Sequence, residues 1–121
     1  MTKEAVLHNF YNSFGIPAYE ENTVPDGAAF PYITYSVVVD SMMSQVFLTA
    51  NLWYRSSSWT SCNAKAREMY ESIASSGVIL PCDGGGIWIK PDTPFAQNMN
   101  DPSDDQIRRK YLRIVAEYIT N

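Results

Sequence analysis

The stretch PCDGGGIWIK, residues 81–90, decides between two kinds of protein. Three glycines in a row could hold a phosphate, but a phosphate-binding loop needs the spacing Gly-x-x-x-x-Gly-Lys-Ser/Thr followed by a helix. Here residues 87–90 alternate as a strand does, and Pro91 comes next. Asp83-Gly84 between two short apolar runs is the typical signal of a tight β-hairpin. We therefore predict a hairpin between strands at residues 78–82 and 86–90.

Three further segments also have the composition of strands. Residues 32–39, YITYSVVV, are rich in β-branched and aromatic residues. Residues 45–55 alternate, with Leu48 and its even-numbered neighbours on one face, and the short DSMMS linker predicts an antiparallel hairpin of these two segments. Residues 107–119, IRRKYLRIVAEYI, predict a last strand with Leu112, Ile114, Ala116 and Tyr118 on one face; a helix is the alternative, because Arg, Lys, Leu, Ala and Glu all tolerate helices.

Two segments repeat their apolar residues with the period of a helix. In residues 2–14 these residues recur at steps of three and four, Thr2 can cap the start, and Gly15 suits the end. Residues 58–75 form the second helix, which Ser57 or Ser58 caps and Gly77 ends; its stripe is Trp59, Cys62, Ala66, Met69 and Ile73. Residues 20–31 and 91–106 are rich in turn formers and predict long surface loops.

These elements follow the order α, β, β, α, β, β, β. Runs of adjacent strands favour an α+β fold in which two helices pack on one face of an antiparallel sheet. A length of 121 residues fits a single domain, residues 1–121, that buries a core without staples.

The composition limits the classes of function. A net charge of −4 argues against sequence-independent duplex binding across the whole surface, which needs a basic footprint. No stretch has the roughly 20 apolar residues of a membrane span, so no membrane partner is expected. The first residues, MTKEAVLHNF, lack the apolar core of a signal peptide, which predicts a cytoplasmic origin.

The sequence offers no convincing reactive centre. The paired carboxylates lie in predicted loops, where they are usually solvated, and the acidic residues of 101–105 depart from the EF-hand pattern of a calcium site. His8 is the one histidine and is expected to be a partly buried structural residue. Cys62 and Cys82 are expected to be free thiols, with a disulfide as the alternative. We therefore expect no catalytic residue, cofactor or metal.

Two features point instead to contacts with other proteins. The aromatic residues Trp53, Tyr54, Trp59 and Trp88 exceed what two thin layers need to bury, and Trp, Tyr and Arg dominate protein–protein hot spots. The basic run at 108–113 directly follows the acidic NDPSDD. It either balances charge at the start of a strand or contacts an acidic partner or a nucleic-acid backbone.

Several stretches resemble the small tail-terminator or tail-completion (head–tail joining) proteins of long-tailed bacteriophages and phage-tail-like elements. The resemblance covers roughly residues 30–118 and rests on FPYITYSVVVD, LTANLWYRSSSW, ILPCDGGGIWIK, PFAQNMNDPSDDQIRRKYL and the closing strand. These motifs are structural, and none of them is a catalytic signature.

The resemblance implies a virion protein that is assembled in the host cytoplasm. Such proteins form a ring, typically of six subunits, on the head-proximal end of the tail tube. The ring stops tube polymerisation, offers a docking surface to the neck or head-joining protein, and meets the sheath protein in contractile tails. DNA only passes through the lumen, and the net charge of −4 is compatible with a wall that repels it. A head-closure or connector protein of the neck is the alternative, and a small-ligand or nucleotide-binding enzyme is the third.

A ring needs two different patches on each subunit, because its contacts run head to tail. We expect these patches to use the long loops, the glycine hairpin and the exposed aromatic residues. Basic side chains of one subunit would then meet acidic side chains of the next. The expected interface residues are Asp101, Asp104, Asp105, Arg108, Arg109, Arg113, Gly84, Gly85, Trp88 and Trp53.

Overall fold

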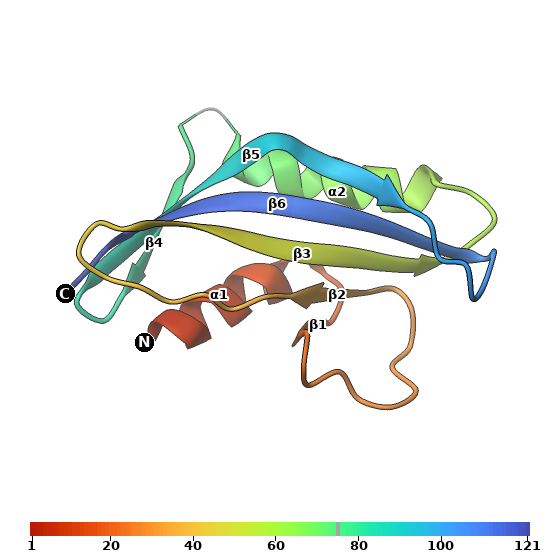
Figure 1. The fold of residues 1–121 in the computed structure, drawn as a ribbon, viewed down its shortest axis with the longest axis horizontal. Coiled ribbons are helices and arrows are strands. Elements are labelled where there is room, and N and C mark those ends of the chain that lie inside the picture. Colours follow the sequence, from red (N-terminus) through yellow and green to blue (C-terminus); the bar gives the residue numbers. More distant parts are fainter. Residues whose placement is uncertain (75) are drawn as a thin grey trace.

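The computed structural model describes residues 1–74 and 76–121, in which a six-stranded sheet lies in front of two α-helices (Figure 1). The helices are α1 (Lys3–Tyr11) and α2 (Thr60–Ile73), and a short 3-10 helix, η1 (Asn12–Phe14), follows α1. The strands are β1 (Ala18–Glu20), β2 (Tyr32–Tyr35), β3 (Gln45–Arg55), β4 (Val78–Cys82), β5 (Gly85–Met99) and β6 (Ile107–Ile119).

The strand order is β1-β2-β3-β6-β5-β4, and every neighbouring pair is antiparallel except β1 and β2. The predicted α+β class is confirmed, as is the predicted strand at residues 107–119. The parallel pairing of β1 makes the sheet mixed and adds one strand to the predicted order. A three-residue strand is too short to show an alternating pattern, so β1 has no recognisable signal in the sequence.

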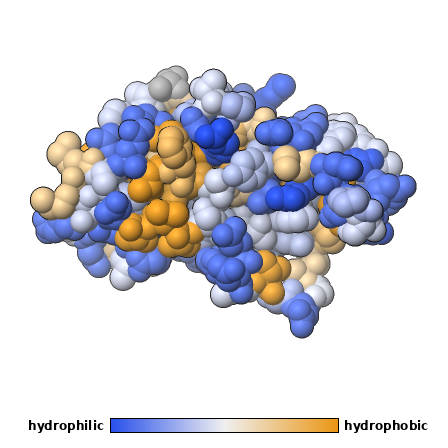
Figure 2. Space-filling view, in the orientation of Figure 1, coloured by the Kyte–Doolittle hydropathy of each residue, from blue (hydrophilic) through white to orange (hydrophobic). Residues whose placement is uncertain are grey.

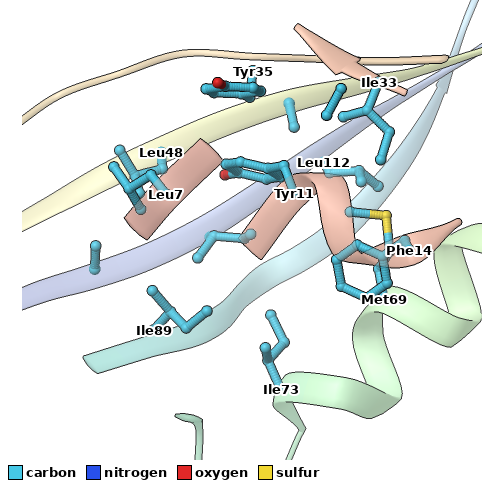
Figure 3. Close-up of a cluster of buried hydrophobic side chains, with 14 of the residues drawn as sticks. Leu7, Tyr11, Phe14, Ile33, Tyr35, Leu48, Met69, Ile73, Ile89 and Leu112 are labelled. Atoms are coloured by element: carbon cyan, nitrogen blue, oxygen red, sulfur yellow. The ribbon is translucent and has the colours of Figure 1, made fainter. Parts of the chain in front are cut away.

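The core lies between the sheet and the two helices (Figure 3). Leu48, Leu52 and Leu112 are at most 1% exposed and point toward the helices, as the alternation predicts. Leu7 of α1 and Met69 of α2 meet them from the other layer. Burying side chains of this size contributes roughly 1.5–3 kcal/mol each, so this layer contact dominates the energetics of the fold.

Local signals fix the helix ends. The Thr2 hydroxyl accepts a hydrogen bond from the Ala5 N–H at 3.1 Å, and Gly15, with φ of 83°, ends η1. The Ser58 hydroxyl accepts from the Thr60 N–H at 3.1 Å, so this serine satisfies a donor at the start of α2. The predicted helix over residues 58–75 is shorter in the structure: α2 ends at Ile73 and the chain is extended at Ala74, so Gly77 does not end it. Residue 75, the last of the predicted helix, lies outside the described residues.

Two predicted boundaries moved because of strand pairing. Residues 91–99 were predicted as a loop but continue β5, with a register shift between Pro91 and Ala96. Prolines break a regular ladder but are tolerated at a bulge, and β6 supplies a partner on both sides of it. Conversely, the strand predicted over 32–39 pairs only from Tyr32 to Tyr35. In the described parts of the chain, no helix combines the length and the apolar character that crossing a membrane requires.

Candidate interaction surface

The face of the sheet that turns away from the helices, the open face, carries four of the ten predicted interface residues: Trp53, Trp88, Arg109 and Arg113. Alternation along β3 and β6 places Trp53 opposite Arg109 and Thr49 opposite Arg113 on this open face. Trp88 lies on the same face of β5. The strands thus bring together side chains that are far apart in the sequence.

One end of the open face, which we call the loop end, holds an ordered aromatic and cationic cluster of Tyr32, Trp53 and Arg109. The Trp53 ring stacks on Tyr32 with centroids 6.1 Å apart, and its indole N–H donates to the Thr34 hydroxyl at 2.8 Å. The Arg109 guanidinium lies 5.1 Å from the Trp53 centroid, and its Nε donates to Asn51 Oδ1 at 2.8 Å. This cation–π geometry leaves Arg109 without a carboxylate partner among the described residues.

The basic run at 108–113 is divided between the two faces of the sheet. Arg108 and Lys110 point to the helix side, where they lie 5.7 and 5.5 Å from the Trp59 centroid. The Arg108 guanidinium donates to the carbonyls of Asp105 and Ser57, so it ties the loop 100–106 to the chain before α2. The basic residues of 108–113 therefore do not form a single patch, because successive side chains of a strand point to opposite faces.

The acidic residues beside this run are engaged within the chain. The hydroxyl and N–H of Ser103 both donate to Asp101 Oδ1, and these bonds lower the pKa of Asp101. A bond from the Gln106 N–H, and then the ion pair with Arg55, lower the pKa of Asp104. Neither carboxylate forms an ion pair with the basic run among the described residues, although the charge of Arg109 also helps to lower the pKa of Asp101.

Arg113 forms an ion pair with Asp92 at 2.8 Å, on the open face. Among the predicted basic residues, Arg109 therefore lies on the open face and forms no ion pair with a carboxylate of the described chain. Asp105 contributes its backbone carbonyl to Arg108.

The other end of the open face, the terminal end, lies near both chain ends and is apolar. Phe47 is 57% exposed and Ile79 is 59% exposed, and cross-strand neighbours Val115 and Trp88 lie between them. Figure 2 shows the resulting orange patch. The loop before β3 adds two more exposed side chains, Met42 and Met43. Contiguous exposed apolar surface of this kind marks interaction sites.

This apolar patch was not predicted from the sequence, although apolar residues at the solvent-side positions of two strands indicate it. Phe47, Val115 and Ile119 are apolar at the positions that alternate with the core residues of β3 and β6. Such residues on the solvent side of a half-covered sheet are unexpected for a surface that faces only water. Trp88, which was predicted as an interface residue, is held here by an indole bond to the Ser76 carbonyl at 2.7 Å and by Lys90, 4.0 Å from its centroid.

The glycine hairpin of the opening stretch is confirmed, and it packs on its own chain. Asp83 and Gly84 form the turn, and a Cβ on Gly85 would overlap the Ile119 carbonyl oxygen. The Met1 amino group lies 2.6 Å from the Asp83 carboxylate, and the Asp83 N–H donates to the Met1 carbonyl. The turn thus joins the N-terminus to the end of β6. Whether Gly84 and Gly85 also meet a neighbouring subunit stays a prediction.

The remaining reactive side chains do not converge. His8 is exposed, so the prediction of a partly buried histidine is wrong; its Nδ1 lies 2.7 Å from the Tyr35 hydroxyl. Cys62 and Cys82 are free thiols, as predicted, and burial raises the pKa of the Cys62 thiol to about 11. Residues 1–74 and 76–121 contain no group of three His, Cys, Asp or Glu side chains that could hold a metal ion.

No protein-family model and no curated protein matches the chain. Among solved structures, a chain of the "Virion of native gene transfer agent (GTA) particle" superposes with a TM-score of 0.63 at 15% sequence identity. The alignment covers 96% of this chain and 93% of that one. The two chains share a fold. The likeness in fold extends over nearly the full length of both.

Proposed function

We propose that this chain is a structural protein of a phage-like virion. The observation that carries the proposal is the end-to-end likeness to a chain of the gene transfer agent virion. The resemblance in sequence to tail-terminator proteins points in the same direction. The described residues offer a broad open sheet face with exposed aromatic and apolar side chains, which suits a protein that acts by contact.

Within the virion, we infer the role that the sequence resemblance implies. The chain forms a ring, of about six subunits, at the head-proximal end of the tail tube. The ring ends tube polymerisation and receives the neck or head-joining protein, and in a contractile tail it also meets the sheath. The open face supports this role because its two ends differ in chemistry, and a head-to-tail ring needs two different patches.

The test is the size and shape of the purified protein. Multi-angle light scattering and negative-stain electron microscopy are expected to give a closed ring. Because the ring could require the tube tip, the same measurement is repeated with the tail-tube protein of the same particle. Tubes capped at one end support the terminator role, and a ring that binds only the head-joining protein supports the neck connector. A strict monomer under both conditions that binds nucleotide would overturn the proposal.

The basic residues provide a directed variant of this test. Reversing both Arg108 and Arg109 to Glu is expected to abolish rings. The single variant Arg109→Glu should have most of this effect, because Arg109 lies on the open face without a carboxylate partner. Arg108→Glu serves as the control, since it removes bonds to the carbonyls of Asp105 and Ser57 and should mainly loosen the loop 100–106. Intact rings in the Arg109→Glu variant would refute this contact.

A further inference from the structure

Two segments of this chain are suited to strand pairing but have a side on which no strand of the described residues pairs with them, and they lie at opposite margins of the sheet. One is the valine segment, residues 37–39, which follows β2. The other is the free edge, residues 95–99, the last part of β5.

The valine segment is held in place at both ends but makes no backbone ladder. Before it, the Ser36 N–H donates to the Thr49 carbonyl of β3 at 2.8 Å, and after it the Lys3 ammonium donates to the Asp40 carbonyl at 2.7 Å. Within the described chain, the N–H groups of residues 37–39 donate to no backbone carbonyl. Val38 and Val39 are 42% and 40% exposed. Figure 1 shows the segment passing beside β3 at the margin of the sheet.

The composition of the valine segment makes its lack of a partner informative. Three consecutive valines have the highest preference for strands, and the sequence predicts a strand through residue 39. Places where a strong local preference is not used in the monomer tend to be functional. The Tyr118 hydroxyl donates to the Val38 carbonyl at 2.5 Å, so one carbonyl is engaged within the chain and the N–H groups are left over.

The free edge is a formed strand with one empty side. From Gly85 to Ile89, β5 has β4 on one side and β6 on the other, but from Ala96 to Met99 it pairs with β6 alone. Its sequence FAQNM contains no charge and no proline, the usual devices that protect an edge from pairing. Phe95 packs on Tyr70 of α2, which holds the start of the edge, while Gln97 and Asn98 are exposed.

We propose that the free edge of one copy pairs with the valine segment of the next copy and so continues the sheet from subunit to subunit. The two segments cannot meet within one chain, because β3 and β6 lie between them. Both halves of the contact nevertheless belong to this sequence, which favours a second copy over another protein. The contact is head to tail, the type of contact from which rings are built when the rotation between neighbouring subunits closes. This inference rests on the proposed ring and names the surfaces that form it.

The first experiment removes one N–H donor from the valine segment. Val39→Pro deletes an N–H that has no backbone acceptor in the described chain. In an extended segment this N–H points to the side opposite the Val38 carbonyl, which Tyr118 binds from within the chain. Val39→Thr is the matched control, since it also removes an apolar methyl group but keeps the N–H and the branched Cβ. We expect Val39→Pro to weaken ring association at least about tenfold, the equivalent of one lost hydrogen bond. Val39→Thr should form rings as the unchanged protein does.

The second experiment identifies the occupant of the free edge by disulfide trapping. One protein carries Val38→Cys or Val39→Cys and the other carries Gln97→Cys, Asn98→Cys or Met99→Cys, all with Cys82→Ser so that only the buried Cys62 remains. Scanning these positions covers the possible registers. Mixed pairs are expected to give cross-linked dimers, and a chain carrying both cysteines should give a ladder of multimers. Each single variant alone should give neither.

The outcomes separate the inference from the proposed function. If the protein forms rings but Val39→Pro forms them equally well, or every cysteine pair fails to cross-link, the strand pairing is overturned and the ring stands. Cross-linking of the free edge only to the tube protein also overturns it, because the occupant is then another chain. If the unchanged protein forms no ring, alone or with tubes, the proposed function fails first and the inference falls with it.

Discussion

The two faces of the sheet are built from the same strands but obey different rules. Phe47 and Leu48 are consecutive in β3, yet Phe47 is 57% exposed and Leu48 is 1% exposed. The covered face is mostly aliphatic with buried tyrosines and packs on the helices, whereas the open face mixes aromatic, charged and apolar side chains. The comparison teaches that the covered face determines stability, and that the open face is available for contacts with other molecules.

The sharpest test of this comparison is truncation of the two neighbours. Leu48→Ala leaves a cavity between the sheet and the helices and is expected to lower the free energy of unfolding by about 2–5 kcal/mol. Phe47→Ala removes an exposed ring whose described contact is Arg113, 5.9 Å from its centroid, and should change it by less than about 1 kcal/mol. Urea denaturation measures both variants. Equal losses would break the comparison.

Gly85 lies outside the covered core, but its substitution should cause the next largest loss in the free energy of unfolding. Alanine there must displace the Ile119 backbone, and the position has φ of 151°. Gly15→Ala is the matched control, because Gly15 has φ of 83° but no atom within 4 Å of a new Cβ. The control isolates the left-handed backbone penalty of about 1–2 kcal/mol. Gly85→Ala should exceed the control by about 1–3 kcal/mol in thermal or urea unfolding; equal values would mean that the end of β6 yields freely.

On the open face, Trp53→Ala should separate association from stability. The stacked, hydrogen-bonded indole has the character of a hot spot, so ring association is expected to weaken at least about tenfold. Thr34→Val removes only the hydroxyl that orients the indole and should have a smaller effect of the same sign. Light scattering over a dilution series measures both. Unchanged association would place Trp53 outside the contact.

High pH should destabilise the covered face through its tyrosines. Burial raises the pKa of Tyr118 to about 12, above its ordinary value of 10, and burial also raises the pKa of Tyr11. The unfolded chain therefore loses these protons first, so the stabilisation is complete below pH 10 and declines as the pH rises toward 12. Denaturation midpoints at pH 8, 10 and 11 test this. A midpoint that is constant up to pH 11 would contradict it.

The smallest expected change is on the same covered face. The Tyr11 ring stacks on Tyr35, with centroids 4.7 Å apart, but its buried hydroxyl has no hydrogen-bond partner among the described residues. Tyr11→Phe keeps the ring and removes the unsatisfied group, so it should raise the free energy of unfolding by about 1 kcal/mol. Tyr35→Phe, whose hydroxyl contacts His8, should lower it by a similar amount. A loss in Tyr11→Phe would mean that the hydroxyl has a partner after all.

The sequence predicted the elements whose signal is local. Alternation in residues 45–55 and 107–119 identified β3 and β6 and the side of each that is buried. The glycine turn identified the β4–β5 hairpin. The same alternation, extended to Arg108 and Arg109, would have divided the basic run between two faces. The exposed apolar residue Phe47 could have been noticed in the same way.

Other features depended on partners that are distant in the chain. The prolines of residues 91–94 predict a loop, but β6 pairs with β5 on both sides of the bulge. Conversely, Val38 and Val39 have every local reason to form a strand, and yet they pair with no strand among the described residues. Local preference cannot decide either case, because a ladder needs two strands at the right spacing.

The sequence by itself therefore determined the α+β class, the buried sides of β3 and β6, and the glycine hairpin, because side-chain alternation and turn chemistry act over a few residues. Only the tertiary structure decided the strand order, the parallel β1, the extent of β5 and the gathering of Trp53, Tyr32 and Arg109 at the loop end. These depend on which strand lies beside which, and that choice is made by the burial of the whole covered face against the two helices.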